Sequence, residues 1–222
     1  IMANVESIYQ GMCRKMLLRQ ATTFAQAWQD WYIYHNFFQN RTWGDGVYVD
    51  FGTNHPTVIS NTIFFDKCLG WKGVCVEMNP SYHQGIKAKR GCSLIPTCVL
   101  DREVQVGVSS KGHRSTVVKP SEGAWMRTCT TLRKVFAEHH IEKVDLMSID
   151  IEGREADVLR CLDLRSLNVR LILIEVNKYA VETVDAFFHS QGYASVASFP
   201  GLDNLYERLP SAPMYPPHAA CD

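Results

Sequence analysis

Acidic side chains stand at or directly after the ends of four apolar segments that have the length of buried strands. These residues are Asp50, Glu77, Asp150 and Glu175. The carboxyl ends of parallel strands meet at one edge of a sheet, where such folds bind their ligands. Carboxylates placed together favour a cationic ligand, which is a sulfonium, an ammonium or a metal ion.

The loop after the first of these segments has a glycine, Gly52, which lets a ligand approach the backbone closely. The patterns G-x-G-x-x-G and G-x-x-x-x-G-K-[ST] are both absent, which argues against a dinucleotide enzyme and a phosphate-cradling NTPase. A carboxylate at Glu77 is well placed to accept hydrogen bonds from ribose hydroxyls. Asp50 and Glu77 together predict a ligand that contains an adenosine and a cationic group.

From Gly46 onward, short apolar runs alternate with amphipathic segments. Strands that alternate with helices of about ten to fifteen residues indicate a parallel sheet covered on both faces. We therefore predict an α/β fold with a doubly wound, mostly parallel sheet. The expected strands are residues 47–51, 73–77, 93–99, 144–149, 169–175, 193–198 and 204–209, and the expected helices are residues 58–69, 80–90, 130–140, 152–162 and 180–191.

Three segments lie outside this alternation. Residues 3–39 have apolar positions at three- and four-residue steps and are expected to be helical. Their aromatic run, residues 31–38, either packs on the core or lines an acceptor pocket. Residues 101–127 lack a clear period and predict an edge strand at 104–108 followed by a mobile loop beside the site. The expected organisation is an N-terminal helical cap (1–45), a core (46–209) and an irregular, proline-rich tail (210–222).

Four stretches of the chain resemble the FkbM-type methyltransferases: Val47–Asn54, Ser60–Thr62, Leu69–Pro80 and Asp145–Glu155. The S-I-D-I-E-G-x-E pattern in the last of them is the most specific, and the resemblance covers residues 46–208. It implies the Rossmann-like class I methyltransferase fold, in which the last two of seven strands form an antiparallel hairpin. It also implies S-adenosylmethionine as the methyl donor.

The resemblance further implies the residues that bind this donor. The family pattern usually has a glycine where this chain has Pro56, so we expect the loop that follows Gly52 to take a different path. The expected donor-binding residues are Asp50, Gly52, Thr53, Asn54, Ser60 and Asn61 on the methionine side, Glu77 at the ribose, Met78, Asn79, Cys98 and Val99 around the adenine, and Asp150 at the methionine ammonium or the acceptor.

The leading functional hypothesis is O-methylation of a small-molecule or carbohydrate hydroxyl. A hydroxyl has a high pKa and calls for a base, for which Asp150, Glu152 and His55 are the candidates. A divalent metal held by Asp150, Glu175 and Asn177 is a secondary hypothesis. Two alternatives stay open, a non-catalytic binding module with an altered donor loop and an RNA or cap methyltransferase.

Composition limits the classes of partner. Twenty-three basic and 23 acidic residues give a net charge of zero, which argues against a nucleic-acid partner because such binding needs clustered basic charge. No run of about 18 apolar residues and no signal-peptide segment is present. The eight cysteines include no C-x-x-C pair, so we predict reduced, mostly buried thiols and a cytoplasmic protein, unless a segment precedes Ile1. The oligomeric state is left open.

Overall fold

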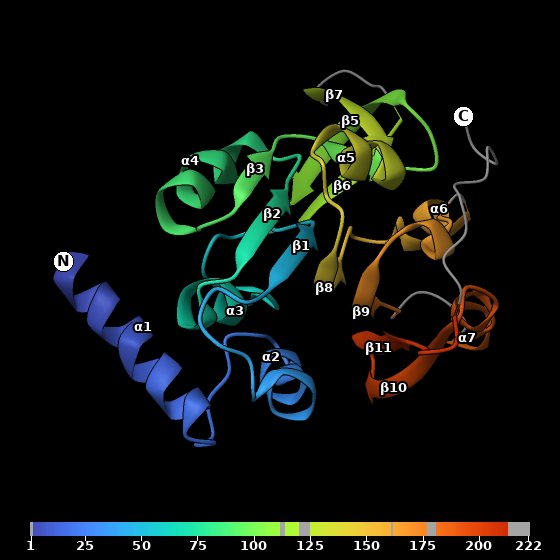
Figure 1. Cartoon of the computed structure of the whole chain (residues 1–222). Helices are drawn as coiled ribbons and strands as arrows, with labels where there is room; N and C mark the ends of the chain where they lie inside the picture. The colour runs from blue at the N-terminus through green and yellow to red at the C-terminus, as the bar shows by residue number, and fades with distance from the viewer. Residues whose placement is uncertain (1, 112–113, 120–124, 161, 177–180, 213–222) are drawn as a thin grey trace.

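The computed structural model describes residues 2–111, 114–119, 125–160, 162–176 and 181–212. Seven strands form one sheet in the order β10-β11-β9-β8-β1-β2-β3 (Figure 1). Its pairs are parallel, except that β11 is antiparallel to both β9 and β10. The predicted doubly wound sheet is therefore confirmed. Its strands are β1 (Val47–Phe51), β2 (Lys72–Val76), β3 (Ser93–Ile95), β8 (Val144–Ile149), β9 (Val169–Glu175), β10 (Tyr193–Phe199) and β11 (Asp203–Arg208).

Side chains of the central strands alternate between two buried clusters, one on each face of the sheet. Tyr48 and Leu146 belong to the cluster shared with the N-terminal elements and α3. Val49 and Met147 belong to the cluster shared with α5, α6 and α7. Both faces are apolar, which explains why these strands are continuous hydrophobic runs. The helices are α1 (Met2–Leu17), α2 (Gln29–Ile33), the π-helix η1 (Tyr34–Phe38), α3 (Ile63–Leu69), α4 (Pro80–Lys89), α5 (Leu132–Glu138), α6 (Glu155–Arg160), the 3₁₀ helix η2 (Leu164–Ser166) and α7 (Val181–Ser190).

The periodicity predicted one helix over residues 3–39, but the N-terminal segment does not form a single helix. Helix α1 ends at Leu17, and the backbone turns at Arg19, whose φ is 57°. In Figure 1, α1 reaches away from the body of the molecule, whereas α2 lies against it. The aromatic run packs on the core, because Tyr34 and Phe38 are buried beside α3. Burial of a large apolar side chain contributes about 1.5–3 kcal/mol to stability.

A second, four-stranded sheet forms where the sequence predicted an edge strand and a mobile loop. Its order is β4-β7-β5-β6, and it lies at one end of the large sheet (Figure 1). The predicted strand 93–99 is in fact two strands, one in each sheet, which are separated at residues 96–97. Turn residues such as Pro96 interrupt the ladder because proline has no N–H to donate. The strands are β4 (Cys98–Leu100), β5 (Val104–Lys111), β6 (Arg114–Val118) and β7 (Trp125–Thr131).

The loop between β1 and α3 is longer than predicted, because the helix begins at Ile63 and not at residue 58. Asn54 and Ile59 both have left-handed backbone, with φ of 57° and 54°. Pro56 is buried, and it packs so close to Gly85 that a methyl group there would meet it at 3.0 Å. The loop therefore takes an irregular path over residues 52–62. The expected helices 130–140 and 152–162 are also shorter in the structure, where they span 132–138 and 155–160.

Six cysteines form three disulfides: Cys13–Cys68, Cys75–Cys92 and Cys98–Cys129. The prediction of reduced thiols is wrong for these residues, since each pair is brought together by the fold although its members are 17 to 55 positions apart. The first pair ties α1 to α3, and the third joins two neighbouring strands of the small sheet. Among the described residues, no helix has the length and apolar character needed to cross a membrane. Most of the predicted tail lies outside the described residues.

Candidate active site

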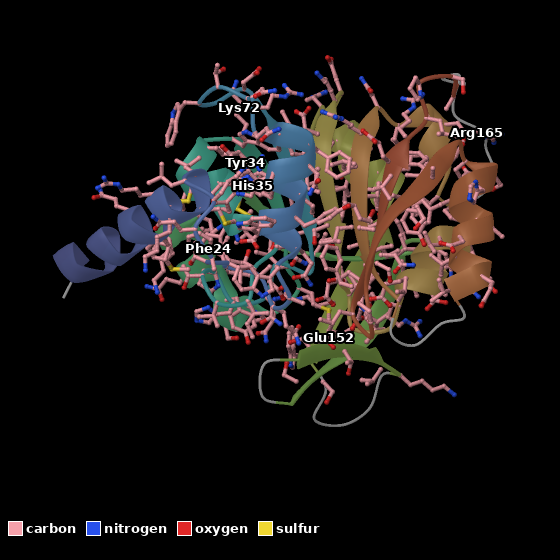
Figure 2. All side chains as sticks on the ribbon, turned by 90° about the horizontal axis from the view of Figure 1, so that it is seen from below. Phe24, Tyr34, His35, Lys72, Glu152 and Arg165 are labelled. Atoms are coloured by element: carbon pink, nitrogen blue, oxygen red, sulfur yellow. A yellow bond between two sulfur atoms is a disulfide. The ribbon has the colours of Figure 1, made fainter. Side chains whose placement is uncertain are left out.

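Five carboxylates follow the carboxyl edge of the large sheet. In the order of the strands they are Glu77 after β2, Asp50 in β1, Asp150 after β8, Glu175 at the end of β9 and Asp203 at the start of β11. Figure 2 shows Glu152 at this end of the molecule, beside the small sheet, with Lys72 at the opposite end where β2 begins. The sequence placed four of these five residues correctly at strand ends.

Two hollows open along this edge and meet at its centre. The first, which we call the slot, has a volume of about 50 Å³, and the second, the wide cavity, has about 410 Å³. The slot lies beside β2 and the small sheet, and the wide cavity lies between the β1 loop, the N-terminal segment and β11. Four residues line both hollows: Gly52, Asn54, Asp150 and Glu152. A ligand that fills both must therefore pass Asp150.

Glu77 lines the slot and fixes the loop that separates it from the wide cavity. One of its carboxylate oxygens accepts a hydrogen bond from the Asn54 N–H and the other from the Asn79 N–H, each at 2.7 Å. Burial raises the pKa of Glu77, and these backbone hydrogen bonds oppose that shift. Each oxygen keeps a further lone pair, so the carboxylate can still accept from ligand hydroxyls.

Asp50 is held from below by a buried arginine that the sequence did not reveal as important. Arg90 Nε donates to Asp66 at 2.6 Å, and its Nη1 lies 3.8 Å from the Asp50 carboxylate. The Thr62 hydroxyl donates to Asp50 at 2.6 Å. Burial raises the pKa of Asp50, and the positive charge of Arg90 opposes this. Asp50 lines the wide cavity, and Arg90, which it shares with Asp66, offsets part of its negative charge.

Asp150 stands among other acids at the junction of the two hollows. Burial raises its pKa well above the usual value, and the charges of Glu175, Asp203, Glu152 and Glu155 raise it further. Glu155 accepts from the N–H groups of Ile151 and Gly153 and so shapes the turn after β8. A raised pKa suits a group that must take up a proton near neutral pH.

His55 lines the wide cavity, but its ring is engaged in shaping the loop. Its Nδ1 accepts from the N–H groups of Thr57 at 3.2 Å and Val58 at 3.1 Å. A neutral imidazole with an accepting Nδ1 carries its proton on Nε2. To act as a base, His55 would have to give up these two hydrogen bonds, so the geometry favours Asp150 for that role.

The other residues expected at the donor site divide between the two hollows, with the exception of Asn79. Thr53, Ser60 and Asn61 line the wide cavity, and Met78, Cys98 and Val99 line the slot. Asn79 lies outside both linings: its side chain caps α4 by accepting from the Ser81 N–H, and it donates to Ser115 of β6 at 2.8 Å. Cys98 is bonded to Cys129, so it offers the slot a disulfide wall and not a thiol.

Two of the three residues expected to hold a metal ion lie close together. Oxygen atoms of Asp150, Glu175 and Glu155 are within 4.8 Å of one another. Asn177, the third expected ligand, lies outside the described residues. Glu155 is 1% exposed and already binds two backbone N–H groups through one oxygen. Mg²⁺ and Ca²⁺ usually take six or more oxygen ligands, so the metal hypothesis stays a prediction.

Several residues of the site were not predicted as site residues from the sequence. Gln26 and Gln29 come from the N-terminal segment, and Asp203 comes from the last hairpin. Ser115 and Val117 come from the small sheet and line the slot. They reach the site from elements far apart in the chain, so spacing along the sequence could not have grouped them.

The buried carboxylate of Asp203 should make the unfolding free energy depend on pH. Burial raises its pKa to about 6, from 3.8, while its hydrogen bond from Gln29 opposes that rise. Protonation therefore stabilises the fold: this contribution is complete below about pH 4 and is lost as pH rises through about 6, at a cost on the order of 3 kcal/mol. In urea titrations between pH 4 and 7.5, Asp203→Asn should lose less stability with rising pH than the wild type. The exposed Glu142→Gln variant should follow the wild type, and so would Asp203→Asn if Asp203 did not titrate in this range.

Comparison with known proteins decides the family. The family model for the methyltransferase FkbM domain matches residues 50–195, which contain the end of β1, all of β2, β8 and β9, and every strand-end carboxylate above except Asp203. The chain belongs to the FkbM methyltransferase family. It is thus a methyltransferase domain of enzyme class 2.1.1, and the family implies S-adenosylmethionine as methyl donor. Comparison with curated proteins gives no match.

Among the solved structures that resemble this FkbM domain, one has a TM-score that supports a shared fold. A putative rRNA-methylase from Clostridium thermocellum has a TM-score of 0.50 and 11% identity, and the match covers 85% of this chain and 98% of that one. The precorrin-6y C5,15-methyltransferase from Geobacter metallireducens GS-15 has a TM-score of 0.42 and 13% identity, with 76% and 84% covered. At these identities the likeness concerns the fold alone.

Proposed function

We propose that this FkbM domain transfers a methyl group from S-adenosylmethionine to a hydroxyl of a small molecule or carbohydrate. The observation that supports this most directly is the meeting of the slot and the wide cavity at Asp150. The slot lies where the nucleoside half of the donor would bind and would have to open beyond its about 50 Å³ to take it, whereas the wide cavity can take the methionine half together with the acceptor. The reacting atoms would then meet beside a carboxylate.

The chemistry of the lining fits the donor. The slot offers the Glu77 carboxylate for ribose hydroxyls and apolar walls, Val76 and Val99, for the base. On the wide-cavity side, the loop at Gly52 and Thr53 brings backbone against the methionine half, while Asp150 offers a negative charge for its ammonium or sulfonium. When bound, the donor supplies a methyl group on a positively charged sulfur, which makes that carbon electrophilic.

The chain's own residues would then have two tasks. The first is to hold the acceptor hydroxyl in line with the methyl group, about 3 Å away, which is the main source of rate in such a displacement. The second is to accept the hydroxyl proton as the new O–C bond forms and the S–C bond breaks. Asp150 is the group we assign to this second task, because it lines both hollows and its pKa is raised by burial and by its acidic neighbours. Glu152 and His55 remain the other candidates.

Donor binding is the first test of this function. Saturating S-adenosylmethionine or its demethylated product should raise the unfolding free energy, by about 2.7 kcal/mol at 100 times a micromolar dissociation constant. Glu77→Ala should abolish this gain, because it removes the ribose acceptor and the anchor of the Asn54 and Asn79 N–H groups. The shift is measured by thermal or urea unfolding.

Glu142→Gln, an exposed change of the same residue type, serves as the control and should keep the full shift. No stabilisation of the wild type by either compound would instead favour the binding-module alternative. The RNA alternative is disfavoured by charge, since no lysine or arginine occurs in the described lining of the wide cavity. Binding to RNA that falls steeply with salt would revive it.

We also propose that the protein works in an oxidising compartment and not in the cytoplasm that the sequence had suggested. The three disulfides support this, because such bonds form and persist in secretory and extracellular spaces and are rare in reducing ones. Alkylation of the protein isolated from its native source, without reductant, should leave these six cysteines unlabelled in a mass spectrum. Labelling of all six would contradict the proposal.

A further inference from the structure

The wide cavity extends well beyond the part that a methyl donor can use. A donor that reaches from Glu77 to Asp150 spans β2, β1 and β8. Two more strands, β9 and β11, continue the sheet on the far side of Asp150, and each brings one carboxylate, Glu175 and Asp203, to the cavity wall. These two groups therefore face the acceptor.

Glu175 and Asp203 are direct partners across the antiparallel β9–β11 pair. Side chains of such partners lie on the same face of the sheet with their Cβ atoms about 4.5–5.5 Å apart, and like charges in this position repel each other. Both residues are buried, with 8% and 5% of their surface exposed, so water screens the repulsion only weakly.

The N-terminal segment fixes one member of this pair. Gln29 is 1% exposed, and its Nε2 donates to an Asp203 carboxylate oxygen at 2.6 Å. A neutral amide orients the carboxylate without cancelling its charge. The Ala27 N–H in turn donates to Gln29 Oε1 at 2.7 Å, which fixes the direction of the amide. The fold thus holds a buried carboxylate in one orientation at the acceptor end of the cavity.

We propose that Asp203 and Glu175 form a subsite for a protonated amine, so that the acceptor is a hydroxyl compound that also carries an ammonium group, such as an amino sugar or an amino alcohol. This inference rests on the proposed methyl transfer and names its substrate class. An ammonium group donates three hydrogen bonds and can bridge two carboxylates. It offsets their repulsion, and it leaves the acceptor hydroxyl to face Asp150 on the next strand.

The electrostatics of the lining agree with a cationic acceptor. The described lining of the wide cavity has five carboxylates and no lysine or arginine, and Arg90, beneath Asp50, is shared between Asp50 and Asp66. Burial and the charge of Glu175 both raise the pKa of Asp203, to about 6. A cation beside these groups favours their ionised forms, whereas a phosphate or carboxylate on the acceptor would be repelled.

The test compares three sugars of similar size and different charge: glucosamine, glucose and glucuronate. Each is titrated at pH 7, with EDTA present, into protein saturated with S-adenosylhomocysteine, and thermal stability is recorded. We expect glucosamine to raise thermal stability at a concentration at least about tenfold lower than glucose does. This is the ratio of affinities that one charge-assisted hydrogen bond provides. Glucuronate should give no shift.

In the double variant Asp203→Asn, Glu175→Gln, glucosamine should raise thermal stability only at the concentration at which glucose does so. The control variant Glu142→Gln should keep the preference for glucosamine over glucose. Equal shifts for glucosamine and glucose in the wild type, a stronger shift with glucuronate, or no shift with any sugar would each overturn the inference. So would a preference that appears only when EDTA is replaced by Mg²⁺ or Mn²⁺, because the carboxylates would then hold a metal.

Stabilisation by S-adenosylhomocysteine alone is recorded first. Its absence would count against methyl transfer itself, and its presence without a sugar preference would count only against the amine subsite.

Discussion

Gly52→Ala is expected to weaken donor binding strongly and to destabilise the fold. Gly52 has a φ of 80°, which costs an L-residue with a side chain about 1–2 kcal/mol. A Cβ at this position would also lie only 1.8 Å from the Asp150 carbonyl oxygen, which is backbone and cannot rotate away. The β1 loop and the end of β8 would have to separate at the junction of the slot and the wide cavity. A shift of this kind should weaken donor binding roughly a hundredfold or more.

Gly201→Ala is the matched control for this change. Gly201 has a similar φ, 73°, and no atom lies within 4 Å of where its Cβ would be. This variant should therefore lose only the stability that a left-handed backbone costs a residue with a side chain, which urea unfolding measures. In calorimetry it should bind S-adenosylhomocysteine as tightly as the wild type. If Gly52→Ala were no worse than Gly201→Ala in both measurements, the close approach to Asp150 would not matter to the site.

Arg90→Leu should have the largest effect on stability. The Arg90 side chain is fully buried and connects β1 to α3, because it donates to the Tyr48 hydroxyl of β1 at 3.2 Å and to the Asp66 carboxylate of α3 at 2.6 Å. Its removal leaves the buried carboxylates of Asp50 and Asp66 without their cation. Breaking a buried ion pair in this way costs about 3–5 kcal/mol. Because the same network holds the wall of the wide cavity, donor affinity should fall together with stability.

Arg160→Leu gives the comparison for Arg90→Leu. Arg160 also bonds to acids, Asp157 and Asp101, but its side chain is 63% exposed. Exposed pairs of this kind contribute about 0–1 kcal/mol. Arg90→Lys keeps the charge but loses the planar fork, so its loss of stability in urea titrations should fall between the two. Equal losses for Arg90→Leu and Arg160→Leu would mean that the buried network carries no stability.

The strand-end carboxylates and the central strands were predictable because local pattern and global fold agree there. The strands β1, β8 and β9 have the predicted bounds, since runs such as Val144–Ile149 are apolar on both faces and can be stable only inside a sheet. Asp150 and Glu77 then had to lie at the carboxyl edge. Chain direction in a parallel sheet leaves no other place for them.

Other features depended on contacts between distant residues, which no local pattern records. The sequence could not pair Cys13 with Cys68, because a disulfide requires the two Cα atoms to be close, here 5.2 Å apart, and proximity comes from packing. The small sheet consists of β4, β5, β6 and β7, whereas only an edge strand and a loop were expected over residues 101–127. These strands are held by pairing with one another, as β4 and β5 each pair with β7, and no periodicity in the sequence indicates this pairing.

By itself, the sequence determined the fold class, the methyltransferase family resemblance and the row of acids at Asp50, Glu77, Asp150 and Glu175, because these follow from strand composition and chain direction. Only the tertiary structure decided how those acids are used. Arg90 lies beside one of them and offsets part of its charge, backbone N–H groups donate to another, and Asp203 lies opposite Glu175 through an antiparallel pairing. The physical reason is that the charge and hydrogen bonding of a buried carboxylate depend on its neighbours in space, and those neighbours come from other parts of the chain.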